Sequence, residues 1–301
     1  MLSWERLRVL DAVAQHGSIG AAAAALHVTA PAVSQHLRKL SRESGVALLE
    51  PDGRGVRLSA AGRVLAEHAR VASDAIAHAE RDLAELSGEA MGPLRVGAVG
   101  SALRGLSQRA LGHLRDHHPK VSPQVSDGEG IDMLPALRAG ELDLAIVESW
   151  STRPIRLPSL VETQVVGEEP VYVAVAADHR AASWDQARLH DLSDETWASC
   201  ATGTDAYEAL VQTMRDHGLE PRIAHRIGDY TSQLVIVAGG HAISLVPELA
   251  RHQAPEGVVF VRCDSRIRRQ IVAAYVRGHA TPTVRAGIEA WQYAAGSLSA
   301  R

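Results

Sequence analysis

Cysteines and long apolar runs are scarce in this sequence. Its 301 residues include only two cysteines, Cys200 and Cys263, which lie outside any C-x-x-C pattern, so a disulfide framework and a thiolate zinc site are both excluded. No apolar run approaches the roughly 20 residues that cross a bilayer, and the N-terminus is charged early, unlike a signal peptide. We therefore expect a cytoplasmic protein with no membrane partner.

The motifs of common catalytic and cofactor sites are missing as well. The sequence contains no H-E-x-x-H, G-x-S-x-G or G-x-x-x-x-G-K-[ST] pattern, and the stretch GAVGSALRG does not match G-x-G-x-x-G. The fifteen histidines are scattered without the spacing of metal ligands. We expect no enzyme activity, no cofactor and no metal site.

The composition and the distribution of charge indicate a globular chain of several parts. With 46% apolar and 22% charged residues, the composition is ordinary for a globular protein, and the length suggests two or three folded units. The net charge is −4, yet residues 1–63 carry eight basic and five acidic side chains, a local charge of +3. Residues 64–92 are acidic, with a local charge of −4. A basic N-terminal region suits contact with DNA, which the overall charge alone would disfavour.

The N-terminal region is expected to contain short helices. Apolar residues recur at helical spacing from Trp4 to Val13, and Gly17 and Ser18 supply a helix end followed by a new N-cap. Residues 19–26 are mostly alanine, which is the best helix former. Two helices separated by a tight turn follow from this pattern.

A third helix combines an apolar stripe with a polar face. Thr29 is placed to cap it, Pro31 is tolerated in its first turn, and Val33, Leu37 and Leu40 form the stripe. The opposite face offers hydroxyl, amide and cationic groups that suit base edges and phosphates, from Ser34, Gln35, Arg38 and Lys39. A solvated helix face would also explain any one of these residues taken alone.

The segment LLEPDGRGVRLS predicts a two-stranded hairpin. Gly53 and Gly55 flank Arg54 at its tip, and Arg57 lies on the second strand. An arginine on such a tip can enter the narrow, negative minor groove of DNA. An ordinary surface hairpin has the same pattern.

The order of these elements resembles the winged helix-turn-helix of the LysR-type transcriptional regulators, and the strings A-P-A-V-S-Q and G-R-G-V-R-L-S-x-x-G carry the resemblance. The likeness covers residues 1 to about 90. It departs at Ala30, where members commonly have Gln, and at Leu49 and Pro51, where they have Phe and a nearby Arg. The resemblance implies a sequence-specific regulator of double-stranded DNA. The DNA-binding residues it implies are Thr29, Pro31, Ser34, Gln35, Arg38, Lys39, Arg54 and Arg57.

A long linker helix is expected to pair with a second copy of the chain. Ser59 can cap a helix that runs through the eighties, and its apolar residues repeat in alternating steps of four and three. Such a narrow 3.5-residue repeat indicates a helix that pairs with another helix, and a homodimer or homotetramer follows. The repeating residues are Leu65, Ala69, Ala72, Ile76, Ala79, Leu83 and Leu86.

The rest of the chain predicts an α/β body. From residue 94, short apolar runs alternate with helical segments in a βαβαβ pattern, and a second set opens near Glu168. The resemblance implies a two-lobed effector domain like the type 2 periplasmic binding proteins. The expected division is a winged helix-turn-helix in 1–58, a linker helix in 59–92 and the effector domain in 93–301, with lobe 1 in 93–165 and 266–301 and lobe 2 in 166–265.

A small-molecule effector is expected between the lobes, where the carboxyl ends of the strands meet helix N-termini. The residues expected to line it are Gly100, Ser101, Ala102, Trp150, Thr202, Gly203, Thr204, Tyr230 and Thr231. Each Ser, Thr or Gly could instead serve only as a cap or turn. Acidic residues near the site would favour a cation, whereas helix N-termini favour an anion, so the charge of the effector stays open; these residues are Asp127, Glu129, Glu148, Asp205 and Asp229.

Three alternatives remain at this point. Some LysR-type regulators sense peroxide through a cysteine near the position of Cys200, although Cys263, the other cysteine, lies 63 residues away. A two-lobed binding protein could use its first 90 residues only as a dimerisation arm. A regulator could also lack an effector altogether.

Overall fold

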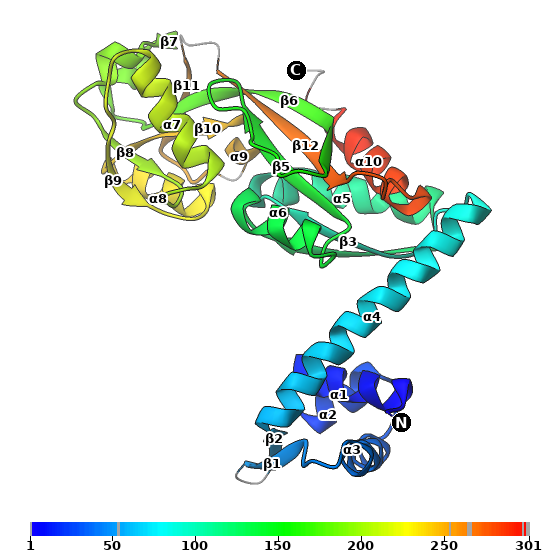
Figure 1. Ribbon diagram of the computed structural model, residues 1–301. Coiled ribbons are helices and arrows are strands. Elements are labelled where there is room, and N and C mark those ends of the chain that lie inside the picture. The colour runs from blue at the N-terminus through cyan, green and yellow to red at the C-terminus, as the bar shows by residue number, and fades with distance from the viewer. Residues whose placement is uncertain (1, 53–54, 253, 264–266, 297, 299–301) are drawn as a thin grey trace. The chain divides into compact units, whose positions relative to one another are not determined.

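The computed structural model describes residues 2–52, 55–252, 254–263, 267–296 and 298. The chain forms two compact units, Met1–Glu80 and Arg81–Arg301, and Figure 1 labels the helices and strands of each. This division into two units does not test the expected three-part division, which stays a prediction.

Three helices build the first unit around one core. Ser18 Oγ accepts a hydrogen bond from the backbone N–H of Ala21, and Thr29 Oγ1 accepts one from that of Ala32, so both predicted caps are confirmed. Gly17 and Gly45 end the first and third helices in the left-handed conformation, which glycine adopts without strain. The helices are α1 (Trp4–His16), α2 (Ile19–Ala25) and α3 (Ala30–Ser44).

A hairpin and the long helix follow. Strand β1 (Leu49–Asp52) pairs antiparallel with β2 (Gly55–Leu58), as the sequence predicts. Helix α4 (Ala60–Ser87) begins directly after Ser59, whose Oγ accepts a hydrogen bond from the Gly62 N–H at 3.0 Å and donates one to the Ala47 carbonyl at 2.7 Å. The predicted cap of this helix is therefore confirmed as well.

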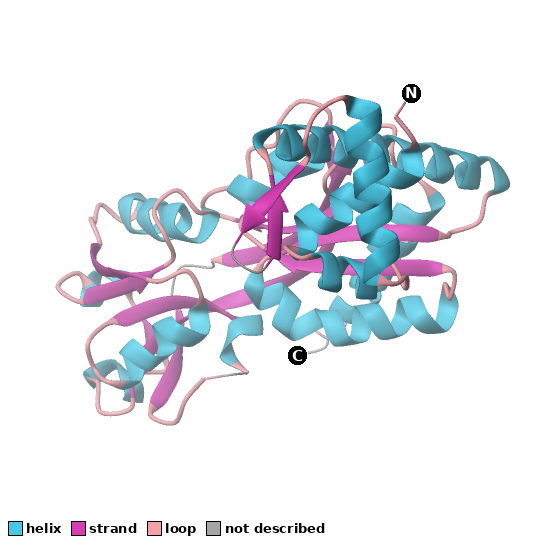
Figure 2. Cartoon of the chain, turned by 90° about the horizontal axis from the view of Figure 1, so that it is seen from below, coloured by secondary structure: helices cyan, strands magenta, loops and turns pink. Residues whose placement is uncertain are grey.

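The second unit is built on one ten-stranded sheet, and helices flank its strands in Figure 2. In its first half, β3 lies parallel to β4 and β5, whereas β12 is antiparallel to β5 and β6. Helices α5 and α10 pack against each other. The elements of this half are β3 (Gly92–Ala98), α5 (Gly100–His117), β4 (Val121–Asp127), α6 (Gly130–Arg138), β5 (Leu144–Trp150), β12 (Arg268–Val276) and α10 (Pro282–Ala295).

The other half of the sheet has its own core. Strand β10 pairs parallel with β8, which pairs parallel with β9, and β10 and β11 both pair antiparallel with the end of β6. The elements are β6 (Val161–Ala176), η1 (Arg180–Ser183), β7 (Gln186–Ala187), η2 (Leu189–Leu192), β8 (Thr196–Ser199), α7 (Asp205–Asp216), β9 (Arg222–Arg226), α8 (Tyr230–Ala238), β10 (Ile243–Pro247), α9 (Glu248–Arg251) and β11 (Val258–Cys263).

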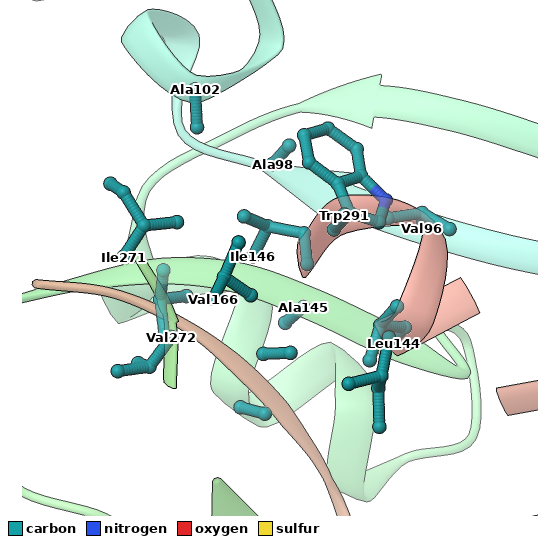
Figure 3. Packing of buried hydrophobic residues seen from close by; sticks show 14 of the residues in the cluster. Val96, Ala98, Ala102, Leu144, Ala145, Ile146, Val166, Ile271, Val272 and Trp291 are labelled. Atoms are coloured by element: carbon teal, nitrogen blue, oxygen red, sulfur yellow. The ribbon is translucent and has the colours of Figure 1, made fainter. Parts of the chain in front are cut away.

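Two separate hydrophobic cores mark the two halves of this unit. Figure 3 shows part of the first, in which Trp291 of α10 lies beside Ala98 and Val96 of β3. Strand β6 joins the halves, because residues 161–170 pair with β12 and residues 171–176 pair with β10 and β11. The predicted lobe boundary at 165/166 falls inside this strand, and the one at 265/266 lies outside the described residues. In the part of the chain that the structure describes, no helix is long and apolar enough to cross a membrane.

Candidate functional site

Helix α3 buries one face and exposes the other. Val33, Leu37 and Leu40 are fully buried in the core of the first unit, which confirms the predicted apolar stripe. The predicted DNA-binding side chains Gln35, Arg38 and Lys39 are exposed, and Ser34 is half-buried. Thr29 and Pro31, at the N-terminal end of the helix, are exposed too. The arrangement leaves a row of donors and cations free to meet a partner.

The hairpin supplies a further cation. Arg57 of β2 is exposed and forms an ion pair with Glu50 of β1, 3.0 Å between Nη2 and Oε1. Arg54, predicted at the tip, lies outside the described residues. Leu49, which departs from the family pattern, packs against the core of the first unit.

The predicted effector residues of the first half lie at the ends of β3 and β5. Gly100 is half-buried at the first position of α5, whereas Ser101 and Ala102 are buried. Trp150, the last residue of β5, is buried in the second core and so links the two halves. The structure therefore brings Ser101 and Trp150 to one region, but Ala102 faces the first core.

The predicted residues of the second half lie at the start of two helices. Thr202 and Gly203 are exposed, and Thr204 caps α7 by accepting a hydrogen bond from the Tyr207 N–H at 3.4 Å. Tyr230, the first residue of α8, is buried, and Thr231 is half-buried. A Cβ added at Gly203 would lie 3.9 Å from the Ile131 side chain of α6, so this loop lies against the first half.

A fully buried arginine lies near these residues and was not predicted from the sequence. Arg269 of β12 donates hydrogen bonds to Glu169 (Nε to Oε1, 2.8 Å), to Glu148 (Nη1 to Oε2, 2.7 Å) and to Ser101 Oγ (2.9 Å). Burial alone would lower the pKa of Arg269, but the charges of Glu169 and Glu148 outweigh burial and raise it. Its neighbour Arg268 is exposed. The two arginines are adjacent in the sequence, and no local pattern indicates which of them is buried.

Burial raises the pKa of Glu169, and two further carboxyl groups near this arginine have raised pKa values. Burial, followed by the charges of Glu148 and Asp205, raises the pKa of Glu129 to about 7. Burial, followed by the charge of Glu148, raises the pKa of Asp205 to about 6. Carboxyl groups that titrate near neutral pH are uncommon outside functional sites. Among the residues that the structure describes, no three His, Cys, Asp or Glu side chains are grouped so as to hold a metal ion.

Both units match known family models. Residues 4–63 match the model described as "Bacterial regulatory helix-turn-helix protein, lysR family", and residues 87–295 match the "LysR substrate binding domain". The chain belongs to the LysR family of transcriptional regulators. It is therefore a DNA-binding transcriptional regulator with an effector-binding domain, and not an enzyme.

Curated LysR relatives and solved LysR structures cover most of the chain. The HTH-type transcriptional regulator YnfL of Escherichia coli is 31% identical over 80% of this chain and 80% of its own. The regulator CbbR of Rhodospirillum rubrum is 30% identical over 80% of this chain and 78% of its own. The crystal structure of full-length CbnR complexed with its target DNA covers 98% of this chain and 100% of that chain with a TM-score of 0.69 at 24% identity, which shows the shared fold.

The environment of Cys200 in this LysR regulator disfavours the peroxide-sensing hypothesis. The thiol is buried in the second core, where Gln233 Nε2 donates to its sulfur at 3.2 Å. Burial, with the charges of Glu148 and Glu129, raises the pKa of Cys200 to about 12, so little reactive thiolate forms at neutral pH.

Proposed function

We propose that α3 reads a specific duplex sequence through its exposed face. The observation that carries the proposal is the division of this helix, in which the apolar stripe is fully buried while Gln35, Arg38 and Lys39 are exposed. Amide and guanidinium groups can bond base edges in the major groove, and cations neutralise phosphates. In this proposal Ser34 adds a hydroxyl contact, Thr29 and Pro31 orient the helix, and Arg57 and Arg54 contact the backbone or the minor groove.

A small-molecule effector bound between the halves of the second unit would modulate this DNA binding. The proposal is supported by the junction at which Ser101, Trp150, Thr204 and Tyr230 lie near strand ends and helix starts, as ligand sites of α/β sheets do. The remaining residues proposed for it are Gly100, Ala102, Thr202, Gly203 and Thr231. We further propose that the protein acts in the cytoplasm as a homodimer or homotetramer, which would place two α3 helices on one operator.

Binding to the intergenic DNA beside its own gene tests the proposed function. We expect fluorescence anisotropy to show an affinity that falls steeply between low and physiological salt, because phosphate contacts release counterions. Arg38→Ala should cost about 1–3 kcal/mol at the preferred site if Arg38 reads a base. If Arg38 grips phosphate instead, the variant should bind all sequences more weakly and show a shallower salt slope.

Arg188→Ala is the matched control, because Arg188 lies in the second unit, outside the residues proposed to contact DNA. It should leave both the affinity and the salt slope unchanged. Full-length protein without salt-dependent duplex binding would contradict the proposal, and would instead favour a binding protein whose first 90 residues act only as a dimerisation arm.

A further inference from the structure

Carboxylates from the two halves of the second unit meet at the N-terminus of α6. Glu129 directly precedes this helix, and Asp205 is the first residue of α7 in the other half. A Cβ added at Gly130 would lie only 2.8 Å from Asp205 Oδ2, so the Asp205 carboxylate packs directly on the residue that follows Glu129. The charge of Glu148, on β5, acts on both Glu129 and Asp205. Three acidic side chains are thus gathered from the N-cap of α6, the first turn of α7 and β5.

The cations nearby do not neutralise this group. Arg269 already pairs with both Glu148 and Glu169, so it meets two carboxylates with one positive charge. Arg153 acts on Asp205 but lies 3.9 Å from Glu208. Asp132, on the first turn of α6, adds another negative charge to the surroundings of Glu129. Arg104 is directed toward Gly100, on the first turn of α5, and acts on Asp229.

Tyr230 supplies an independent indication of a ligand. Its hydroxyl is buried and has no hydrogen-bond partner among the described residues, although a buried hydroxyl normally has one. Burial, followed by the charges of Cys200 and Glu148, raises its pKa, and Glu129 acts on it in the same direction. The hydroxyl thus lies within range of the charges of Glu148 and Glu129, and it is free to accept a hydrogen bond from a ligand. The ring centroid of Trp150 lies 5.9 Å from the guanidinium carbon of Arg269, which bonds Glu148.

We propose that the effector carries a protonated amine, amidine or guanidine group, which binds between Glu129 and Asp205 and donates a hydrogen bond to the Tyr230 hydroxyl. The inference rests on the proposed function, since it names the ligand class of the site between the two halves. Charge-assisted hydrogen bonds to two carboxylates are strong. An anion placed there would meet uncompensated negative charge and would bind poorly.

The pKa values of the two carboxyl groups predict how the affinity for the cation changes with pH. Without ligand, Glu129 and Asp205 titrate at about 7 and about 6, so near neutral pH they are partly protonated. A bound cation favours the ionised forms and lowers both pKa values, so its binding releases protons. Affinity should therefore rise as the pH increases through this range and fall as the pH decreases through it.

Calorimetric titration of the full-length protein with putrescine, L-arginine and benzylamine tests the inference. We expect at least one amine to bind with proton release, measured from the dependence of heat on the ionisation enthalpy of the buffer. Two analogues of putrescine with the same chain length, neutral 1,4-butanediol and anionic succinate, should bind at least tenfold more weakly than putrescine does.

Variants of the two carboxyl groups test the site itself. Glu129→Gln and, separately, Asp205→Asn should each weaken amine binding about tenfold or more. Asp216→Asn is the control, because Asp216 is an exposed carboxylate at the opposite end of α7 from Asp205, and it should leave the affinity unchanged.

Three results would overturn the inference. They are the failure of all three amines to bind at millimolar concentration, binding of succinate at least as tight as that of putrescine, and unchanged amine affinity in both carboxyl variants. DNA anisotropy on the same samples separates this failure from that of the proposed function. Salt-dependent DNA binding without amine binding removes only the ligand class, whereas amine binding without DNA binding contradicts the proposed regulator and leaves the cation site standing.

Discussion

At the scale of single residues, Arg269 is a buried charge in the second unit that depends on its hydrogen-bond partners. Its guanidinium is completely buried and satisfied by Glu148, Glu169 and Ser101, while Glu169 also accepts a hydrogen bond from the Leu249 N–H at 2.6 Å. A buried charge costs several kcal/mol in lost hydration, and its partners offset that cost only while all of them are present. Removing the arginine therefore leaves two buried carboxylates without a counter-charge.

We expect Arg269→Met to lower the free energy of unfolding of the second unit by about 3–5 kcal/mol. Arg268→Gln is the matched control, because Arg268 is the preceding residue of β12, is exposed, and lies 3.9 Å from the exposed Glu168. Urea unfolding followed by tryptophan fluorescence measures both variants. Equal losses for the two would show that the buried network adds nothing specific. Partial recovery in Arg269→Met combined with Glu169→Gln would identify the unpaired carboxylate as the cause.

At the scale of elements, local signals predict the helices well and the sheet less completely. The starts of α3 and α4 follow from Thr29 and Ser59, because a cap depends on residues only three positions apart. The sequence pattern predicts a second set of elements that opens near Glu168, but strand β6 begins at Val161. Nine of its first ten residues pair with β12, about a hundred positions later in the chain, and no local pattern encodes such a partner. Arg269 was missed for the same reason, since its carboxylate partners come from distant strands.

The packing of Gly62 explains why the G-R-G-V-R-L-S-x-x-G string ends in glycine. The start of α4 is fixed on the chain before the hairpin, where the Ser59 N–H donates to the Leu48 carbonyl at 3.0 Å. A Cβ added at Gly62 would lie 2.1 Å from that same Leu48 oxygen, far inside van der Waals contact. Only glycine lets α4 approach the Leu48 backbone this closely.

We therefore expect Gly62→Ala to destabilise the first unit by about 1–3 kcal/mol, because backbone must move to admit the methyl group. Gly20→Ala is the control, since α2 leaves open space around Gly20 and alanine is the better helix former. Differential scanning calorimetry of the full-length chain should show a lower Tm for the first variant only. An unchanged Tm for Gly62→Ala would contradict the close approach of α4 to Leu48.

At the scale of the whole molecule, the residues of the predicted heptad pattern in α4 divide into buried and exposed ones. Of the predicted pairing residues, Leu65 and Ala69 pack within the first unit, whereas Ile76 and Leu83 are exposed. The structure adds two exposed apolar residues that the pattern omitted, Val64 and Val71. Val64 and Val71 are seven residues apart, as are Ile76 and Leu83, which is the spacing of a surface that pairs with another helix. Ile76 and Leu83 thus remain exposed on the predicted stripe, whereas Val64 and Val71 lie on a second face, roughly 100° or more around the helix.

If these exposed residues hold two copies together, a charge among them should separate the copies. We expect Val71→Glu and Leu83→Glu to weaken self-association at least tenfold in sedimentation equilibrium, since each would bury an unpaired carboxylate between helices. Glu67→Ala is the control, because it changes an exposed residue of α4 without altering its apolar side chains. Operator affinity should fall in parallel. When two DNA-binding units are linked, binding of the first raises the effective concentration of the second at the operator, and a monomer lacks this gain. A fully monomeric wild-type protein, or variants that associate as tightly as the wild type, would contradict the assignment of α4 as the pairing helix.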